Sequence, residues 1–322
     1  MTDQPPLTIR GHGLTADFLP LGATLLRLRL DGHDAPLQLG LDDPRHYPEH
    51  AEYMGATVGR VANRIGDARF ELDGKIRALD ANDGPNMLHG GSEGLSHRIW
   101  TVVEHGPTDL VLRIDDADGE MGFPGAVRVT ARMSLHPGAC LRIDYEARAD
   151  APTPCNIAHH SYWCLDDTGD LSSHVLTVAA DRYTPVDDAL IPTGQVAPVG
   201  GTVFDFRAGR SLPGQGVLDH NLCLSDGPVA LRDVAELRST ASGVSMRIAT
   251  TEPGLQVYDG AKLDVAVAGL DGRRYGPHAG TALEPQGWPD APNHERFPSV
   301  ILRPGETYRQ STTFTFSKGT PR

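Results

Sequence analysis

The sequence VRVTARMSL at residues 127–135 alternates apolar and polar residues without a break. The turn sequence HPG follows at 136–138, and LRIDYEA at 141–147 then alternates in the same way. A period of two places the apolar side chains on one face of a strand and the polar ones on the other. Two such runs around a turn predict an antiparallel β-hairpin with one buried face and one face in water.

The same alternation recurs in LRLRL at 26–30, LVLRI at 110–114 and FTF at 314–316. Helical periodicity is almost absent, and the two short candidates are residues 42–50 and 233–239. The composition shows no break, no low-complexity linker and no internal repeat. These features predict an all-β protein, a large β-sandwich of two packed sheets, in which residues 1–322 form a single domain.

The charge balance argues against polyanionic partners. The chain carries 29 Lys and Arg against 42 Asp and Glu, a net charge of −13, so we expect no nucleic-acid and no membrane partner. A neutral small molecule fits this charge better. With 36 glycines and 25 prolines, the chain of 322 residues suits many short strands joined by turns and is long enough to bury an ample core.

The N-terminal sequence MTDQPP has no basic segment followed by an apolar run, and no later stretch approaches eighteen apolar residues. We therefore expect a cytoplasmic protein. The cysteines show no CxxC spacing, which favours reduced thiols over a disulfide framework or a zinc site. They are Cys140, Cys155, Cys164 and Cys223.

A candidate catalytic residue stands near the C-terminus, in ALEPQGWPDAPN at 282–293. Three prolines within eight residues exclude a helix and limit any strand to the first residues. Glu284 is therefore expected at a strand end, between an apolar stem and a rigid turn. A carboxylate held in this way is partly desolvated and fixed in direction, as a general base must be.

Three further polar clusters precede it: GRVANRIG at 59–66, NMLHGG at 86–91 and NIAHHSYWCL at 156–165. Each alone is also typical of surface turns or structural histidines. His159 and His160 are adjacent, and on an extended segment they point to opposite faces, so only one is expected to enter a given pocket. Neither an HExxH motif nor a Cys/His ligand spacing is present, and we expect no metal.

Taken together, these segments resemble the aldose 1-epimerases (galactose mutarotases). The similar segments occur in family order between about residues 55 and 316, and the resemblance is specific as a set. They are GRVANRI, NMLHGG, HHSYW, LIPTG, GTVFDFR, DHN, LQVYDG and LEPQGWPDAPN, followed by FPSVILRPGETY. The resemblance implies the galactose mutarotase-like supersandwich, a sugar substrate, no cofactor and a monomer or homodimer.

The resemblance also implies a role for individual residues. Glu284 matches the general base and His160 the general acid. The residues implied to line the sugar site are Asn63, Arg64, His89, Asp219 and Gln256. The chain departs from the family pattern at several positions, which bear on the preferred sugar: His159, Cys164, Pro285 and residues 259–261.

The implied reaction interconverts the α and β anomers of a free aldose. Ring opening removes the proton from the C1 hydroxyl and delivers one to the ring oxygen, and a placed base and acid each accelerate such transfers by typically ~10²–10⁴-fold. At neutral pH we expect an ionised Glu284 and a protonated His160, each favoured by the other's charge. Two alternatives remain open: a glycosidase that uses Glu284 with Asp219 or Asp290, and a non-catalytic sugar-binding protein.

Overall fold

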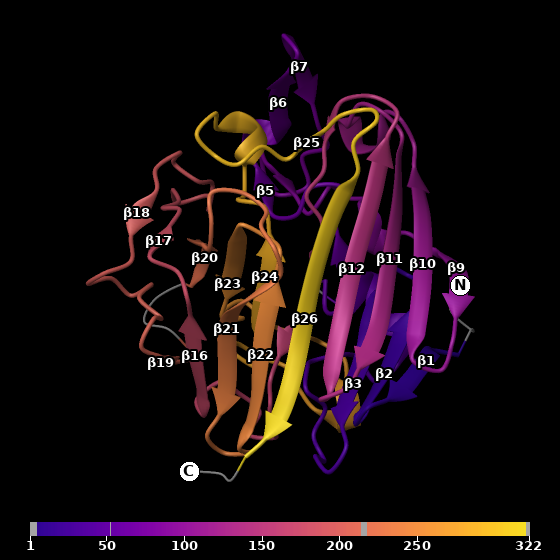
Figure 1. The fold of residues 1–322 in the computed structure, drawn as a ribbon, viewed down its shortest axis with the longest axis vertical. Coiled ribbons are helices and arrows are strands. Elements are labelled where there is room, and N and C mark those ends of the chain that lie inside the picture. Colours follow the sequence, from indigo (N-terminus) through magenta and orange to yellow (C-terminus); the bar gives the residue numbers. More distant parts are fainter. Residues whose placement is uncertain (1–4, 52, 214–217, 320–322) are drawn as a thin grey trace.

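A computed structural model describes residues 5–51, 53–213 and 218–319, and β-strands dominate it (Figure 1). The larger of its two main sheets has nine strands in the order β19-β16-β21-β22-β26-β12-β11-β10-β9, and all neighbours are antiparallel. The strands of this sheet are β9 (Thr101–His105), β10 (Asp109–Asp116), β11 (Val127–His136), β12 (Cys140–Ala149), β16 (His174–Val178), β19 (Arg210–Ser211), β21 (Arg232–Ser239), β22 (Val244–Thr250) and β26 (Tyr308–Lys318).

The second main sheet has six antiparallel strands in the order β15-β24-β23-β20-β17-β18. They are β15 (Tyr162–Trp163), β17 (Arg182–Tyr183), β18 (Ala197–Pro198), β20 (Asp219–Cys223), β23 (Gly254–Tyr258) and β24 (Thr281–Gln286). In Figure 1 the strands β20, β23 and β24 lie behind the nine-stranded sheet.

Smaller sheets complete the fold. A three-stranded sheet is formed by β1 (Leu7–Gly11), β2 (Leu14–Leu19) and β3 (Thr24–Leu30). Four pairs are formed by β4 (Thr57–Val58) with β14 (Ala158–His159), β5 (Arg64–Ile65) with β8 (Met87–Leu88), β6 (Arg69–Leu72) with β7 (Lys75–Ala78), and β13 (Thr153–Pro154) with β25 (Ile301–Leu302). The helical elements are α1 (Tyr47–His50) and the 3₁₀ turns η1 (Pro44–His46), η2 (Gly66–Ala68), η3 (Leu95–His97), η4 (Glu120–Gly122), η5 (Leu270–Gly272) and η6 (Ala291–Asn293).

The predicted hairpin is confirmed as β11 and β12. Their register runs from Val127 opposite Ala149 to His136 opposite Cys140, without a bulge. Alternate residues of β11 are buried, and those between them are exposed or half-buried. The period-two pattern therefore identified both the strands and the buried face.

The core lies between the two main sheets, and one apolar cluster takes side chains from both of them. Trp163 of β15 packs against Phe314 and Phe316 of β26, with ring centroids 4.7 and 5.9 Å apart. Leu255 of β23 and Leu283 of β24 are fully buried in the same cluster. The predicted large β-sandwich is confirmed.

Of the two predicted helical segments, one is confirmed and one is wrong. Residues 42–50 contain η1 and α1. Residues 233–239 instead lie in β21, where they pair with β22 on one side and β16 on the other. The composition of this segment favours a helix, but in the strand Val234, Ala235 and Leu237 are buried. Pairing with the neighbouring strands overrides the local propensity.

All four cysteines are free thiols, as predicted. Within the described residues, the structure contains no helix with the length and apolar character needed to cross a membrane.

Candidate active site

The six-stranded sheet aligns three of the predicted site residues. Glu284 of β24 lies directly opposite Gln256 of β23, and Asp219 begins the next strand, β20. The Gln256 amide Nε2 donates a hydrogen bond to Asp219 Oδ1 at 2.6 Å. All three side chains are largely buried. The sheet register pairs Glu284 with Gln256, and the side-chain hydrogen bond links Gln256 diagonally to Asp219, which lies opposite Tyr258.

His160 reaches Glu284 from the link between β14 and β15. Its Nε2 lies 3.6 Å from Glu284 Oε1, and both side chains are buried. The His160 backbone is fixed on both sides, since its N–H donates to the Ala56 carbonyl and its carbonyl accepts from the Gly55 N–H. The geometry therefore holds one imidazole beside one carboxylate.

His159 points the other way, as strand alternation predicts. Its Nε2 lies 2.7 Å from Ser161 Oγ, and its ring packs against Trp163 and Phe314 in the core. Burial lowers the pKa of His159 to about 3, so the ring is neutral. This side chain belongs to the core, and the candidate site does not include it.

His89 lies beside His160, with ring centroids 5.0 Å apart, and is held by Asn63. The Asn63 N–H donates to His89 Nδ1 at 3.2 Å, and the His89 N–H donates to the Asn63 carbonyl at 3.0 Å. Because Nδ1 accepts a hydrogen bond, the proton of the neutral ring is on Nε2. Both residues adopt a positive φ, 62° for Asn63 and 52° for His89, and such non-glycine residues concentrate at functional sites.

Arg64 is held between two carboxylates. Its Nε donates to Asp83 Oδ2 at 2.8 Å, and its NH1 lies 3.7 Å from Asp219 Oδ2. Asp83 was missed in the sequence because Asn-Asp-Gly is a common turn sequence. The turn is nevertheless built to present it: the backbone of Asp83 pairs with Asn86 across a β-bridge.

These residues line an open cavity of about 230 Å³. It is lined by Tyr53, Asn63, Arg64, Leu88, His89, His160, Tyr162, Asp219, Tyr258, Lys262 and Glu284. The structure thus brings the predicted site residues together, with one difference. Gln256 lies behind the lining and supports Asp219 from there.

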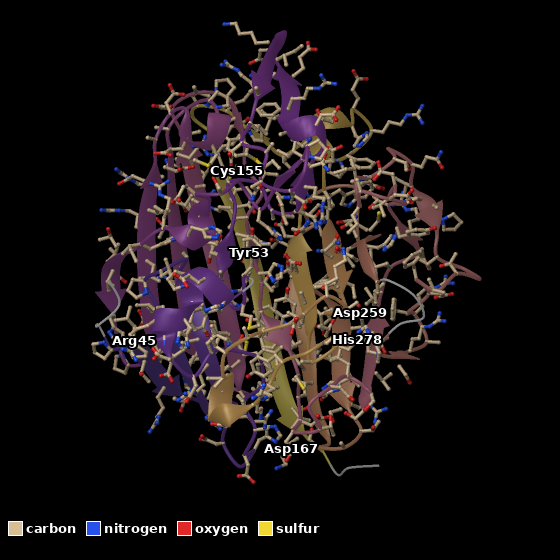
Figure 2. All side chains as sticks on the ribbon, turned by 180° about the vertical axis from the view of Figure 1, so that it is seen from behind. Arg45, Tyr53, Cys155, Asp167, Asp259 and His278 are labelled. Atoms are coloured by element: carbon tan, nitrogen blue, oxygen red, sulfur yellow. The ribbon has the colours of Figure 1, made fainter. Side chains whose placement is uncertain are left out.

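Among the aromatic residues near the site, some line the cavity and others belong to the core. Tyr258 lines the cavity, whereas Trp163 and Trp288 are buried in apolar clusters away from it. Tyr53 was not predicted, because no motif surrounds it. Its ring packs against His89 and His160, with centroids 4.7 and 5.9 Å away. Figure 2 shows Tyr53 near the middle of the face opposite the nine-stranded sheet.

Asp290, the second alternative partner for a glycosidase, is not part of the cavity lining. Its Oδ1 accepts hydrogen bonds from the Gly66 N–H and from Asn293 Nδ2, and its Oδ2 lies 3.1 Å from His294 Nε2. These contacts tie the turn after β24 to the loop that carries Arg64. The geometry therefore gives Asp290 a structural role.

Burial sets the protonation of the central pair. It raises the pKa of Glu284 well above its usual range, and the neighbouring Asp219 charge raises it further against the opposing effect of Arg64. Burial also lowers the pKa of His160 to about 4. The sequence led us to expect an ionised Glu284 beside a protonated His160. The structure favours the neutral pair, because desolvation penalises both charged forms.

The other ionisable groups follow the same physical cause. Burial lowers the pKa of His89 well below its usual range, and the neighbouring His160 and Arg64 side chains lower it further. Burial raises the pKa of Asp219, while Arg64 and the hydrogen bond from Gln256 oppose the rise. His89 is therefore a neutral hydrogen-bond donor through Nε2.

The same cluster has the donor set of a possible metal site. The ligand atoms of His89, His160 and Glu284 lie within 4.8 Å of one another, and all three side chains are buried. A second buried group consists of Cys164, Asp166 and His174. In that group the Leu165 N–H donates to His174 Nε2, and both Asp166 oxygens accept hydrogen bonds from hydroxyl groups. These atoms are therefore already committed to structural contacts.

Comparison with known proteins identifies the family. A family model described as aldose 1-epimerase matches residues 6–315. The chain belongs to the aldose 1-epimerase family. It is similar to the galactose mutarotase of Rattus norvegicus, with 40% identity over 322 residues that cover 96% of this chain and 93% of the relative.

Two further comparisons agree. The chain is 34% identical to the aldose 1-epimerase of Escherichia coli (strain K12), over 96% of this chain and 94% of that protein. The crystal structure of a GalM/aldose epimerase homologue from C. elegans superposes with a TM-score of 0.92 at 34% identity and covers 98% of this chain and 99% of that one. The supersandwich fold and the isomerase class of the aldose epimerase family therefore apply to this chain.

Proposed function

We propose that Glu284 and His160 catalyse the interconversion of the α and β anomers of a free aldose in this aldose 1-epimerase. The observation that carries the proposal is the buried carboxylate–imidazole pair, 3.6 Å apart, in a cavity of about 230 Å³. Anomer interconversion needs one group that accepts the proton of the C1 hydroxyl and one that donates a proton to the ring oxygen O5, at the two oxygens bonded to C1. One such pair is sufficient for both directions.

In the opening step the Glu284 carboxylate takes the proton of the C1 hydroxyl, and the protonated His160 gives one to the ring oxygen O5. The C1–O5 bond breaks as the C1 carbonyl forms, and rotation about C1–C2 turns the other carbonyl face to O5. In the closing step His160 takes the proton back and Glu284 returns one to the carbonyl oxygen. No proton is gained or lost overall.

The pair must therefore hold one proton in total. Burial places that proton on Glu284 in the resting site. A bound sugar supplies hydroxyl groups that hydrogen-bond to a carboxylate, and this favours transfer of the proton to His160 before ring opening. The neutral pair and the ion pair contain the same number of protons, so the transfer needs no exchange with solvent.

The surrounding groups suit the sugar hydroxyls. His89 Nε2 and the Arg64 guanidinium are donors that face the cavity, and the free lone pairs of Asp219 are acceptors. Gln256 fixes Asp219 through the 2.6 Å hydrogen bond. We propose that these groups bind and orient the sugar, and that the chemistry itself needs neither a cofactor nor a metal.

The test is polarimetry of freshly dissolved single anomers across a panel of hexoses and pentoses, galactose among them. The expected result is faster equilibration than in buffer for at least one aldose, unchanged by EDTA. If no aldose equilibrates faster than in buffer, the catalytic proposal is wrong. Loss of activity in EDTA would instead assign a metal to His89, His160 and Glu284, whose ligand atoms lie close enough to share one.

The proposal includes the setting in which the enzyme acts. We propose that residues 1–322 form one domain that works as a monomer or homodimer in the cytoplasm, where its four free thiols stay reduced. Light scattering and cell fractionation test these points.

A further inference from the structure

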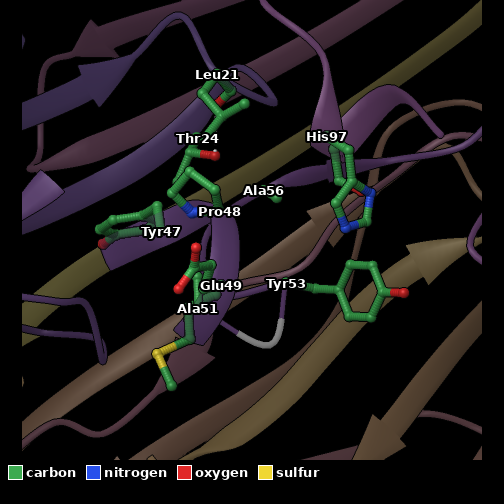
Figure 3. Close-up of a pocket in the computed structure, with 11 residues that line it drawn as sticks. Leu21, Thr24, Tyr47, Pro48, Glu49, Ala51, Tyr53, Ala56 and His97 are labelled. Carbon is green, nitrogen blue, oxygen red and sulfur yellow. Dashed lines mark hydrogen bonds between the residues drawn. The ribbon is translucent and has the colours of Figure 1, made fainter. Parts of the chain in front are cut away.

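A second cavity adjoins the active site. It has a volume of about 250 Å³ and shares Tyr53 with the active-site cavity of about 230 Å³. Figure 3 shows the rings of Tyr53 and His97 on one side of it and Tyr47, Pro48 and Glu49 on the other. Because it is no smaller than the cavity proposed to hold one aldose, it has room for a further sugar ring.

The lining combines an apolar part with aromatic rings and with imidazole and carboxylate groups, as in a sugar subsite. The apolar residues are Leu21, Pro48, Ala51, Met54 and Ala56, and the others are Thr24, Tyr47, Glu49, Tyr53, Ser96 and His97. The hydroxyl groups of Thr24 and Tyr47 are already used, since Thr24 Oγ1 donates to the Leu21 carbonyl and the Tyr47 hydroxyl accepts from the Leu41 N–H. Ser96 Oγ lies 3.1 Å from His97 Nδ1, and within the described part of the chain His97 Nε2 has no hydrogen-bond partner. The Glu49 carboxylate is exposed, and its contact among the described residues is His50 Nε2 at 4.0 Å.

Tyr53 forms the boundary between the two cavities. Its ring contacts His89 and His160 in the active site and His97 in the second cavity, where the ring centroids are 5.7 Å apart. Tyr53 also has a φ of 66°, a left-handed conformation that is uncommon for a residue with a Cβ. The backbone turn therefore directs this ring to the wall that both cavities share.

The position of the catalytic pair indicates which part of a substrate would cross this boundary. Across the sheet, His160 lies on one side of Glu284, and Gln256 and Asp219 lie on the other. His160 is proposed to serve the ring oxygen, which is bonded to C5, and C5 carries C6. The C6 substituent is therefore expected on the His160 side, where Tyr53 packs.

We infer that the second cavity is a subsite for a sugar unit joined through O6 of the reacting aldose, so that this epimerase acts on 6-O-linked reducing disaccharides as well as on free hexoses. This inference rests on the proposed function. It assigns the half-buried Tyr53 as the boundary that the substrate crosses, and Glu49 and His97 as partners for hydroxyl groups of the second sugar.

The experiment compares kcat and KM for three freshly dissolved reducing sugars: a free hexose, a disaccharide joined through O6 of its reducing hexose, and a disaccharide joined through O4. The expected result is turnover of the O6-linked disaccharide with a KM no higher than that of the hexose, and a much higher KM for the O4-linked one. The O4-linked sugar controls for the general effect of size.

Two variants test the subsite directly. Glu49→Gln removes one charged acceptor and should raise KM for the O6-linked disaccharide by about 2- to 10-fold, the effect of one hydrogen bond, without changing KM for the hexose. Ala51→Leu places extra carbons in the cavity wall and should raise the same KM further. Glu236→Gln makes the same charge change at an exposed position of β21 and should leave all three sugars unchanged.

The outcomes separate the two proposals. If the hexose is turned over but the O6-linked disaccharide is not, or if Glu49→Gln and Ala51→Leu raise KM for both sugars alike, the subsite is refuted and the proposed function stands. If not even the hexose is turned over, the proposed function fails and the subsite with it. Glu49→Gln keeps the test valid should Ala51→Leu fail to fold.

Discussion

Replacing Arg60 by methionine should destabilise the protein strongly, although Arg60 lies outside the active-site cavity. Its guanidinium is almost fully buried and meets Asp116, with an NH2–Oδ2 distance of 2.7 Å. The same group donates to Thr153 Oγ1 and to three backbone carbonyls, those of residues 117, 124 and 125. Arg60→Met replaces the aliphatic stem of the side chain by an unbranched apolar chain and removes the guanidinium with every donor.

The magnitude follows from burial. Removing one partner of a buried ion pair costs about 3–5 kcal/mol, because the remaining polar groups stay buried without a partner. Arg98 also pairs with Asp116, so in the variant this carboxylate still has one cationic partner. We therefore expect a loss near the lower end of that range. Since 1 kcal/mol shifts the Tm of a chain this large by about 2–3 °C, Tm should fall by roughly 6–10 °C.

The matched control is Arg128→Met. Arg128 Nε lies 2.6 Å from Asp115 Oδ1, as close as the buried pair, but both side chains are more than half exposed. Surface pairs of this kind contribute little, so thermal unfolding followed by circular dichroism should show no clear change for this variant. Equal Tm losses for Arg60→Met and Arg128→Met would refute the reasoning that burial, and not distance, decides the effect.

Three further predictions concern ionisable groups. Because burial raises the pKa of Glu284 and lowers that of His160 to about 4, kcat/KM should fall below about pH 4 and above the raised carboxyl pKa. Asp219→Asn removes a charge that raises the Glu284 pKa, so the fall of kcat/KM at alkaline pH should move to lower pH. If this fall stays at the same pH, it belongs to the titration of another group. His159→Asn should reduce kcat far less than His160→Asn in polarimetric assays, because His159 faces the core; the reverse order would exchange their roles. Burial raises the pKa of Glu252 from 4.5 to about 7, so between these pH values the folded state binds more protons than the unfolded state. The free energy of unfolding should therefore fall by ~3 kcal/mol as pH rises from 4.5 to 7. Urea unfolding at pH 5 and pH 8 checks this, and a Glu252→Gln variant with the same pH dependence as the parent would contradict it.

Much of the fold was readable from local pattern. The alternation at 127–135 and 141–147 identified β11 and β12 and their buried face, because side-chain direction in a strand has a fixed period of two. The same rule separated His159 from His160. The local pattern gave the wrong prediction for residues 233–239. Their composition favours a helix, but they form a strand because they pair with β16 and β22, which are distant in the sequence.

The site was predictable only in part. The sequence groups Arg60 with Arg64 in one loop, and spacing alone does not separate a buried structural arginine from one that lines a cavity. Tyr53 and Asp83 carry no local signal, because their role comes from segments that meet only in the folded chain. The protonation of Glu284 also depends on burial, which no local pattern reveals.

The central claim is that Glu284 and His160 act as one catalytic unit. The most direct test measures kcat for anomer equilibration at saturating sugar in Glu284→Gln, His160→Asn and the double variant. Each single variant should lose about 10²–10⁴-fold, and the double variant should be only a few-fold slower than the slower single one. Near-parental kcat in either single variant, or losses that multiply in the double variant, would contradict the account.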